Sequence, residues 1–240
     1  SARQRFRLTT GIGMTGCATT ASIGNTSLIR YDRYRHLYIL LYVIVLLHKV
    51  INMDSQIMIL KMLLGRKEDR FTIKKISETL GINYRIAYEQ VMKLEKEGLI
   101  RITKVGNSKI CEFTYKFDHK VFEAESMRRE EFFRNKNFLI LHNMLSELKF
   151  PFIALIFGSH AKGIANRHSD IDILAIGGDE KEIKAALSLL PDKIHLTHTT
   201  YEEFIHMAKN KEFTAVSEAM KNNIILVGIE EYYRMIKNAG

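Results

Sequence analysis

The pattern of apolar and polar positions changes twice along this chain. Residues 1–52 show no sustained period, whereas apolar residues recur at helical spacing over most of 53–148. Residues 149–240 alternate short apolar runs with amphipathic helices. These changes predict an α+β fold, with a mainly helical first half followed by a mixed sheet. They also place the expected boundaries after residues 52, 118 and 148.

Residues 53–118 contain three predicted helices and a hairpin. Thr72 and Asn83 are suited to cap the second and third helices, because their side-chain oxygens can accept free helix N–H groups. Strands are expected at 99–105 and 109–115, joined by a Gly-Asn-Ser turn. This order resembles the winged helix-turn-helix of small prokaryotic transcription regulators.

The resemblance implies that the third helix enters the major groove of DNA. The predicted DNA-binding residues are Tyr84, Arg85, Tyr88, Lys104 and Lys109. Arg85 either reads a guanine edge or binds a phosphate. The formal net charge of +9 lies in residues 1–118, since 119–240 are close to neutral. In the alternative interpretation, the module contacts proteins and these side chains form a solvated surface.

Residues 119–148 are expected to form one long helix or two short ones. Val121 and Phe122 are among the apolar positions, and Arg128 and Arg129 begin a predicted charged face. This segment is interpreted as a connector that also offers a contact for a homodimer.

The stretch from residue 157 to 176 carries the candidate chemistry. It predicts a strand, a Gly158-Ser159 turn, a polar loop and a second strand with Asp170 and Asp172. Residues two apart on a strand point to the same face, so both carboxylates project together. Paired carboxylates hold Mg²⁺, and a glycine turn lets backbone N–H groups approach a polyphosphate. The stretch therefore predicts a metal and nucleotide site.

The same motif resembles the signature of the DNA polymerase beta-type nucleotidyltransferase superfamily, in particular its minimal nucleotidyltransferase branch. That signature is Gly-Ser, ten residues and Asp-x-Asp, and here it runs from Gly158 to Asp172. Lys162 stands in an Ala-Lys-Gly segment that the family also has. The resemblance implies Asp170 and Asp172 as catalytic residues and metal ligands, and Gly158, Ser159 and Lys162 as nucleotide-binding residues.

The implied activity is Mg²⁺-dependent transfer of a nucleoside monophosphate from ATP or another NTP to an acceptor hydroxyl. The branch also implies an antitoxin that adenylylates a tyrosine of a HEPN-type toxin. One departure affects the chemistry, because His195 stands where the family carries a third carboxylate. The alternative is a DNA-binding transcription regulator whose nucleotidyltransferase domain binds nucleotide without catalysis. A tRNA-terminal enzyme is disfavoured, because no RNA-binding segment follows the motif.

Other features of the sequence bear on where the protein is located in the cell and on whether it binds zinc. The apolar run 37–47 is too short to span a bilayer, so no membrane role is expected, and residues 1–52 are interpreted as a non-native or disordered leader. The two cysteines, Cys17 and Cys111, give neither a disulfide framework nor zinc spacing, which favours the cytoplasm. His195 and His198 are three apart on a predicted strand, face opposite sides and are not expected to share a zinc ion.

Overall fold

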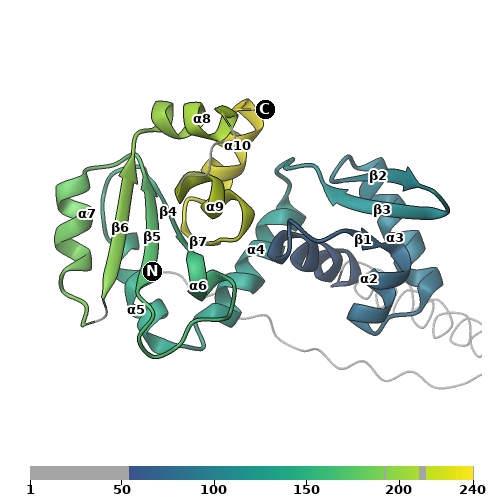
Figure 1. Ribbon diagram of the computed structural model, residues 1–240, viewed down its shortest axis with the longest axis horizontal. Coiled ribbons are helices and arrows are strands. Elements are labelled where there is room, and N and C mark those ends of the chain that lie inside the picture. The colour runs from purple at the N-terminus through teal and green to yellow at the C-terminus, as the bar shows by residue number, and fades with distance from the viewer. Residues whose placement is uncertain (1–53, 192, 211–214, 240) are drawn as a thin grey trace, which may run out of the picture. The chain divides into compact units, whose positions relative to one another are not determined.

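The structure is a computed structural model that describes residues 54–191, 193–210 and 215–239 (Figure 1). Within these ranges the chain is α+β, with one three-stranded and one four-stranded sheet. The expected fold class is confirmed at this level. The predicted leader at residues 1–52 lies outside the described part. Among the described helices, none has the length and apolar character needed to cross a bilayer.

The first part of the described chain has the elements that the pattern predicts. Residues 54–65 are helical. The elements that follow are β1 (Phe71–Thr72), α2 (Ile73–Leu80), α3 (Tyr84–Lys96), β2 (Ile100–Val105) and β3 (Ser108–Phe113). Thr72 Oγ1 accepts the N–H of Lys75 at 3.2 Å, and Asn83 Oδ1 accepts that of Arg85 at 2.8 Å, so both predicted caps are confirmed. The strands are antiparallel in the order β1-β3-β2.

The connector consists of two short helices, which decides between the two expectations for this segment. They are α4 (His119–Phe132) and α5 (Lys136–Ser146). The prediction for Arg128 was wrong, because this side chain is buried rather than solvated. Arg128 Nη1 donates to Glu125 at 2.6 Å, and Nη2 donates to the Asn223 carbonyl oxygen at 2.6 Å. Phe122, expected at an apolar position, is instead exposed.

The second part of the described chain forms a mixed sheet in the order β6-β5-β4-β7. Its strands are β4 (Ile153–Phe157), β5 (Ile171–Ile176), β6 (Ile194–Thr199) and β7 (Ile224–Val227). Its helices are α6 (Gly158–Ala161), α7 (Glu180–Leu187), α8 (Tyr201–Asn210), α9 (Ala215–Lys221) and α10 (Ile229–Ala239). Strand β4 is antiparallel to β5 and β7, whereas β5 and β6 are parallel, so the predicted mixed sheet is confirmed.

Apolar side chains cover both faces of this sheet. Leu155 and Leu174 pack on the face covered by α8, α9 and α10, and Ile156 and Ile173 pack on the face covered by α5 and α7 (Figure 1). This division follows the strand alternation, because neighbouring residues point to opposite faces. Asp172 is two residues before Leu174, so its carboxylate lies on the α8–α10 face.

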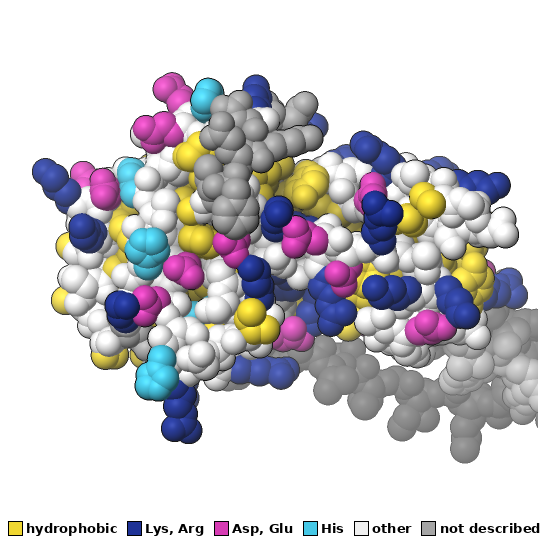
Figure 2. Space-filling view, viewed as in Figure 1, with side chains coloured by type: hydrophobic (Ala, Val, Ile, Leu, Met, Phe, Trp, Pro, Cys, Tyr) yellow, Lys and Arg dark blue, Asp and Glu magenta, His cyan; other side chains and the backbone are white. Residues whose placement is uncertain are grey.

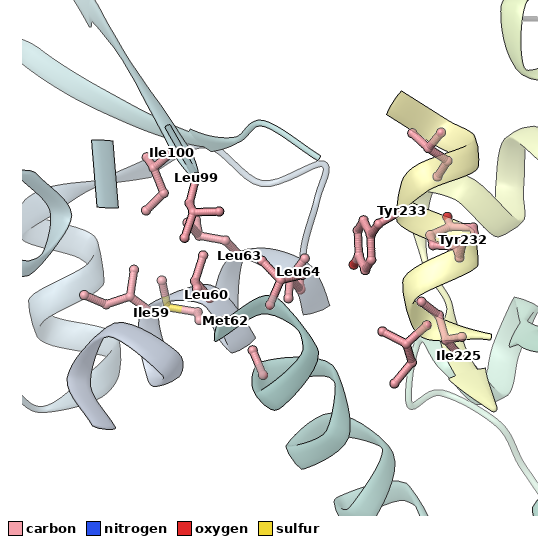
Figure 3. Close-up of a cluster of buried hydrophobic side chains, with 14 of the residues drawn as sticks. Ile59, Leu60, Met62, Leu63, Leu64, Leu99, Ile100, Ile225, Tyr232 and Tyr233 are labelled. Atoms are coloured by element: carbon pink, nitrogen blue, oxygen red, sulfur yellow. The ribbon is translucent and has the colours of Figure 1, made fainter. Parts of the chain in front are cut away.

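The core on the α8–α10 face continues into the first part of the chain. Tyr232 and Tyr233 of α10 belong to the same buried cluster as Leu64 and Leu99 (Figure 3). The ring of Phe113 meets that of Tyr233 edge to face, with centroids 5.8 Å apart. The Tyr233 hydroxyl also donates to the buried carboxylate of Glu125. Described residues on both sides of the predicted boundary at 118 therefore share this hydrophobic core.

Candidate functional site

The Gly158-Ser159 segment begins a four-residue helix rather than a simple turn. Strand β4 ends at Phe157, and α6 starts at Gly158 with φ 68°. The N–H of Lys162 donates to the Gly158 carbonyl oxygen at 3.2 Å and closes the helical turn. A positive φ favours glycine, which explains the residue type at this position. The predicted strand is confirmed, and the following turn is helical.

Gly158 is also required by a close approach. A β-carbon at this position would lie 2.3 Å from Asp172 Oδ2. Strand register explains the contact, because Phe157 of β4 pairs with Asp172 of β5. The Gly158 backbone and the Asp172 carboxylate therefore face the same small space. An anion held by the backbone here would lie next to the Asp172 carboxylate, a candidate metal ligand.

Hydrogen bonds fix the loop that joins α6 to β5. His160 Nε2 lies 3.3 Å from the Ser169 carbonyl oxygen, and its ring meets the edge of Phe138 at a centroid distance of 5.4 Å. The Asn166 N–H donates to Ser169 Oγ at 2.9 Å. The residue before Asp170 is thus tied to α6. The sequence alone gave His160 no structural role of this kind.

Two basic side chains, one just before β6 and one on it, lie against the two candidate carboxylates. Lys193 Nζ is 2.7 Å from Asp170 Oδ2, and His195 Nδ1 is 3.4 Å from Asp172 Oδ1. The Asp170 and Asp172 side chains keep 37% and 29% of their exposed area, so both can reach a ligand from solvent. Asp172 lies on β5 as predicted, whereas Asp170 immediately precedes this strand. The structure adds Lys193, which sequence reasoning did not single out.

His195 occupies the place on β6 that the resemblance assigns to a third acid. In the parallel β5–β6 pair, Asp172 and His195 are register partners. His198 lies elsewhere, with Nε2 3.1 Å from the Gly177 carbonyl oxygen, and the two histidines form no pair. His195 therefore lies directly opposite Asp172 in the β5–β6 register, the position at which the resemblance leads us to expect an acid.

Lys162 is held by a residue distant in sequence. Its Nζ lies 2.5 Å from Glu218 Oε1, and Glu218 belongs to α9. The side chains keep 38% and 30% of their exposed area, so the pair borders solvent. No local pattern marks Glu218, because its role depends on how α9 packs over the sheet.

The residues present fit a magnesium ion with phosphate ligands. Mg²⁺ is usually bound by one or two carboxylates together with water and phosphate oxygens. Asp170 and Asp172 supply that number, whereas the described residues contain no cluster of three or more His, Cys, Asp or Glu side chains suited to a metal. Lys193 covers one Asp170 oxygen, but its side chain is 83% exposed and free to move away. The donor chemistry therefore suits a metal that arrives with its nucleotide.

A cavity of about 700 Å³ opens between β6, α8 and α9. Its lining includes Thr197, Thr199, His206, Met207 and Val216. Thr197 is two residues beyond His195 on the same strand face, which corresponds to about 7 Å. The cavity is therefore on the same face of β6 as His195, although His195 itself does not line it.

The predicted DNA-binding side chains lie on α3 and around the β2–β3 turn. Tyr84 is 53% exposed, and Lys109 Nζ donates a hydrogen bond to the Tyr88 hydroxyl at 3.5 Å. Lys104 and Lys109 are cross-strand partners. Arg85 is solvent-facing but bonded to Glu89 at 3.0 Å. Tyr88 and the two lysines are thus brought together, and Figure 2 shows Lys and Arg side chains spread over this part of the molecule.

Comparison with known proteins supports one part of this assignment. Residues 143–227 match the family model of the nucleotidyltransferase domain. The match covers the Gly158–Asp172 motif, both carboxylates and His195, and it supports nucleotidyl transfer as the general activity. No curated protein and no solved structure matches the chain.

Proposed function

We propose that the chain is a Mg²⁺-dependent nucleotidyltransferase. It transfers a nucleoside monophosphate from ATP or another NTP to an acceptor hydroxyl and releases pyrophosphate. The observation that carries this proposal is the approach of the Gly158 backbone to Asp172, with Asp170 immediately before β5. That arrangement supports an anion and a cation bound side by side, as a metal–triphosphate complex requires.

Each residue of the site has a role in this reaction. Asp170 and Asp172 would hold Mg²⁺, which neutralises phosphate charge and favours the leaving of pyrophosphate when bound. The Gly158 and Ser159 backbone, with the Ser159 hydroxyl, would bind the terminal phosphates. Lys162 would add a positive charge after it leaves Glu218.

His195 is the proposed acceptor of the hydroxyl proton. Its ring contacts Asp172, and Thr197, two residues further along β6, lines the cavity through which we propose that the acceptor enters. A neutral imidazole can take a proton at physiological pH, which a third carboxylate does in the related family pattern. The acceptor oxygen would be deprotonated as it attacks the α-phosphorus, with pyrophosphate as the leaving group.

Label transfer from α-³²P-labelled ATP tests this function. Asp170→Asn and Asp172→Asn should each abolish transfer, because the metal loses a ligand charge. His195→Asp separates the two functional hypotheses, since it restores the expected acid without changing the strand. Increased transfer would indicate a weakened active site. Loss of an existing activity would assign the proton to His195, and inactivity of both chains would contradict the enzyme hypothesis.

The second candidate is a DNA-binding transcription regulator that binds nucleotide without catalysis. Two observations favour it: Asp170 is engaged by Lys193, and His195 replaces an acid. We propose residues 53–118 as a winged helix-turn-helix, 119–148 as its connector and 149–240 as the nucleotidyltransferase domain. Exposed side chains on α3, together with the lysines that flank the β2–β3 turn, support DNA as the binding partner of this module.

A gel-shift titration at low salt tests the DNA contact. Arg85→Ala should weaken binding by about 1–3 kcal/mol if the residue reads a base. Lys104→Ala should weaken binding to all sequences equally and reduce the salt dependence. Equal affinity of the wild type and the double variant would instead assign the module to protein contacts.

The acceptor is proposed from the family resemblance. It is a tyrosine of a HEPN-type toxin, modified in the cytoplasm, and α4–α5 is the proposed contact for a homodimer. Incubation of the two purified proteins with labelled ATP, followed by mass spectrometry of the toxin, tests the first point. Sedimentation of the chain alone tests the second.

A further inference from the structure

A nucleotide bound at the proposed site would have to break the ion pair between Lys162 and Glu218. Lys162 follows α6 directly, and its ammonium is bound to Glu218 rather than left open for phosphate. An exposed ion pair of this kind shifts an equilibrium by about fivefold at most. A triphosphate carries several negative charges and adds metal contacts, so it competes effectively for the same ammonium.

When the Lys162 ammonium leaves Glu218 to bind phosphate, the Glu218 carboxylate is left in an unfavourable electrostatic environment. The carboxylate would then face phosphate oxygens of the same charge without a partner. Like charges at this distance repel, and α9 is the element that can relieve the repulsion by moving. Val216 and Ala219 are buried and anchor this short helix to the sheet.

The other end of α9 touches the segment that joins the first helix to β1. Lys67 Nζ donates to the Met220 carbonyl oxygen at 3.3 Å, and Lys221 Nζ pairs with Glu68 at 3.1 Å. The Lys67 ammonium also lies 5.6 Å from the centre of the Tyr232 ring. These contacts begin two residues after Glu218. The seven-residue helix α9 therefore connects Lys162, the cation proposed to bind phosphate, to residues 66–70.

We propose that α9 couples nucleotide binding to the N-terminal module, and that Glu218 is the positioning residue through which it does so. The triphosphate takes Lys162 from Glu218, and the released carboxylate changes how α9 packs against Lys67 and Glu68. This inference rests on the proposed nucleotide site and adds a regulatory connection to it. By linkage, a change at residues 66–70 alters nucleotide affinity by the same factor.

Glu218→Gln in the full chain is the first test. The amide keeps the size of the side chain but weakens the hold on Lys162, so affinity for Mg²⁺–ATP should rise about two- to fivefold by calorimetry. Glu230→Gln is the matched control, because it breaks an exposed pair with Arg234 on α10 and should leave the affinity unchanged. Lower affinity in Glu218→Gln would contradict the competition.

Hydrogen exchange followed by mass spectrometry tests the coupling itself. In the wild type, Mg²⁺–ATP should change amide exchange in residues 66–70 as well as around Lys162. In Glu218→Gln the change at 66–70 should largely disappear, although ATP still binds, because α9 has already been released. The Glu230→Gln control should respond like the wild type.

Glu68→Gln tests the reciprocal direction. This change removes the pair with Lys221, far from the phosphates, and should alter ATP affinity by up to about threefold. Glu78→Gln is its control, because it breaks only the exposed pair with Lys74 within α2. ATP binding without any response at 66–70 would overturn the coupling and leave the nucleotide site standing. Absence of ATP binding in the wild type would overturn both.

Discussion

The backbone of Gly158 lies so close to the Asp172 carboxylate that a β-carbon would come within 2.3 Å of Oδ2. This relationship joins the start of α6 to β5, the strand that carries Asp172. It places the backbone proposed to bind phosphate directly against Asp172, a proposed metal ligand. The relationship can be tested without touching either carboxylate.

Gly158→Ala should abolish nucleotide binding, because the new methyl group displaces Asp172. Gly163→Ala is a matched control with a similar φ of 71° but no atom within 4 Å of its β-carbon. Both variants should lose about 1 kcal/mol of stability from the left-handed backbone. Only Gly158→Ala should lose ATP affinity by more than about tenfold in calorimetry. Equal affinities would show that the approach does not matter for binding.

The buried pair Glu125–Arg128 should be costly to break. Arg128→Met removes the guanidinium and leaves the Glu125 carboxylate buried without this cation, although it still accepts the Tyr233 hydroxyl. We expect a loss of about 3–5 kcal/mol in the free energy of unfolding by urea. The double variant Glu125→Leu with Arg128→Met should recover much of this loss. Arg234→Met, which breaks an exposed pair, should cost less than about 1 kcal/mol. A small effect of Arg128→Met would mean that water reaches Glu125.

Lys67 should make stability rise with pH. Burial lowers the pKa of this lysine to about 8 from 10.5, and neighbouring Glu125 opposes the shift in part. Between these two pKa values the unfolded chain binds more protons than the folded chain, so the free energy of unfolding increases as the pH rises. The side chain keeps some contact with solvent, so we expect a gain of about 1 kcal/mol between pH 7.5 and 9.5.

The measurement is urea unfolding at several pH values, with Lys67→Met as the reference. The gain should be absent from this variant, since it lacks the titrating amine. The range ends at pH 9.5 because burial raises the pKa of Tyr232 and of Tyr233 from 10, which reduces stability at higher pH. A parallel pH profile for both chains would contradict the assignment.

The Cys111 thiol should be inert in the folded chain. It is buried in β3, and burial raises the pKa of this thiol to about 12. Because the thiolate is the reactive form, Ellman's reagent should label it slowly at pH 8 until urea unfolds the chain. The experiment uses a Cys17→Ser variant, which leaves a single thiol. Fast labelling under native conditions would show that the β1–β3 pair opens readily.

Local patterns predicted most elements, because local chemistry determines them. The caps Thr72 and Asn83 act within three residues, and the position of Asp172 on β5 follows directly from strand alternation, although Asp170 lies just before this strand. The placement of His195 beside Asp172 was also predictable, since the resemblance identified the strand. These features depend on neighbours in sequence or on one sheet register.

Long-range partners were not predictable in this way. Arg128 was expected on a charged surface because its neighbours are charged, yet it bonds to Asn223, 95 residues away. Glu218 carries no motif and meets Lys162 across 56 residues. The interior partners of a charged side chain depend on how helices pack, which periodicity does not describe.

The core shared by α10 and the first helices has a consequence for synthesis. Tyr233 bonds to Glu125 across 108 residues and packs beside side chains that emerge from the ribosome much earlier. During translation, the apolar surface around Leu64 and Leu99 therefore stays exposed until α10 has been synthesised. Folding of the first module is completed by the last described helix, so a nascent chain would pass through a long stage in which it needs chaperone protection.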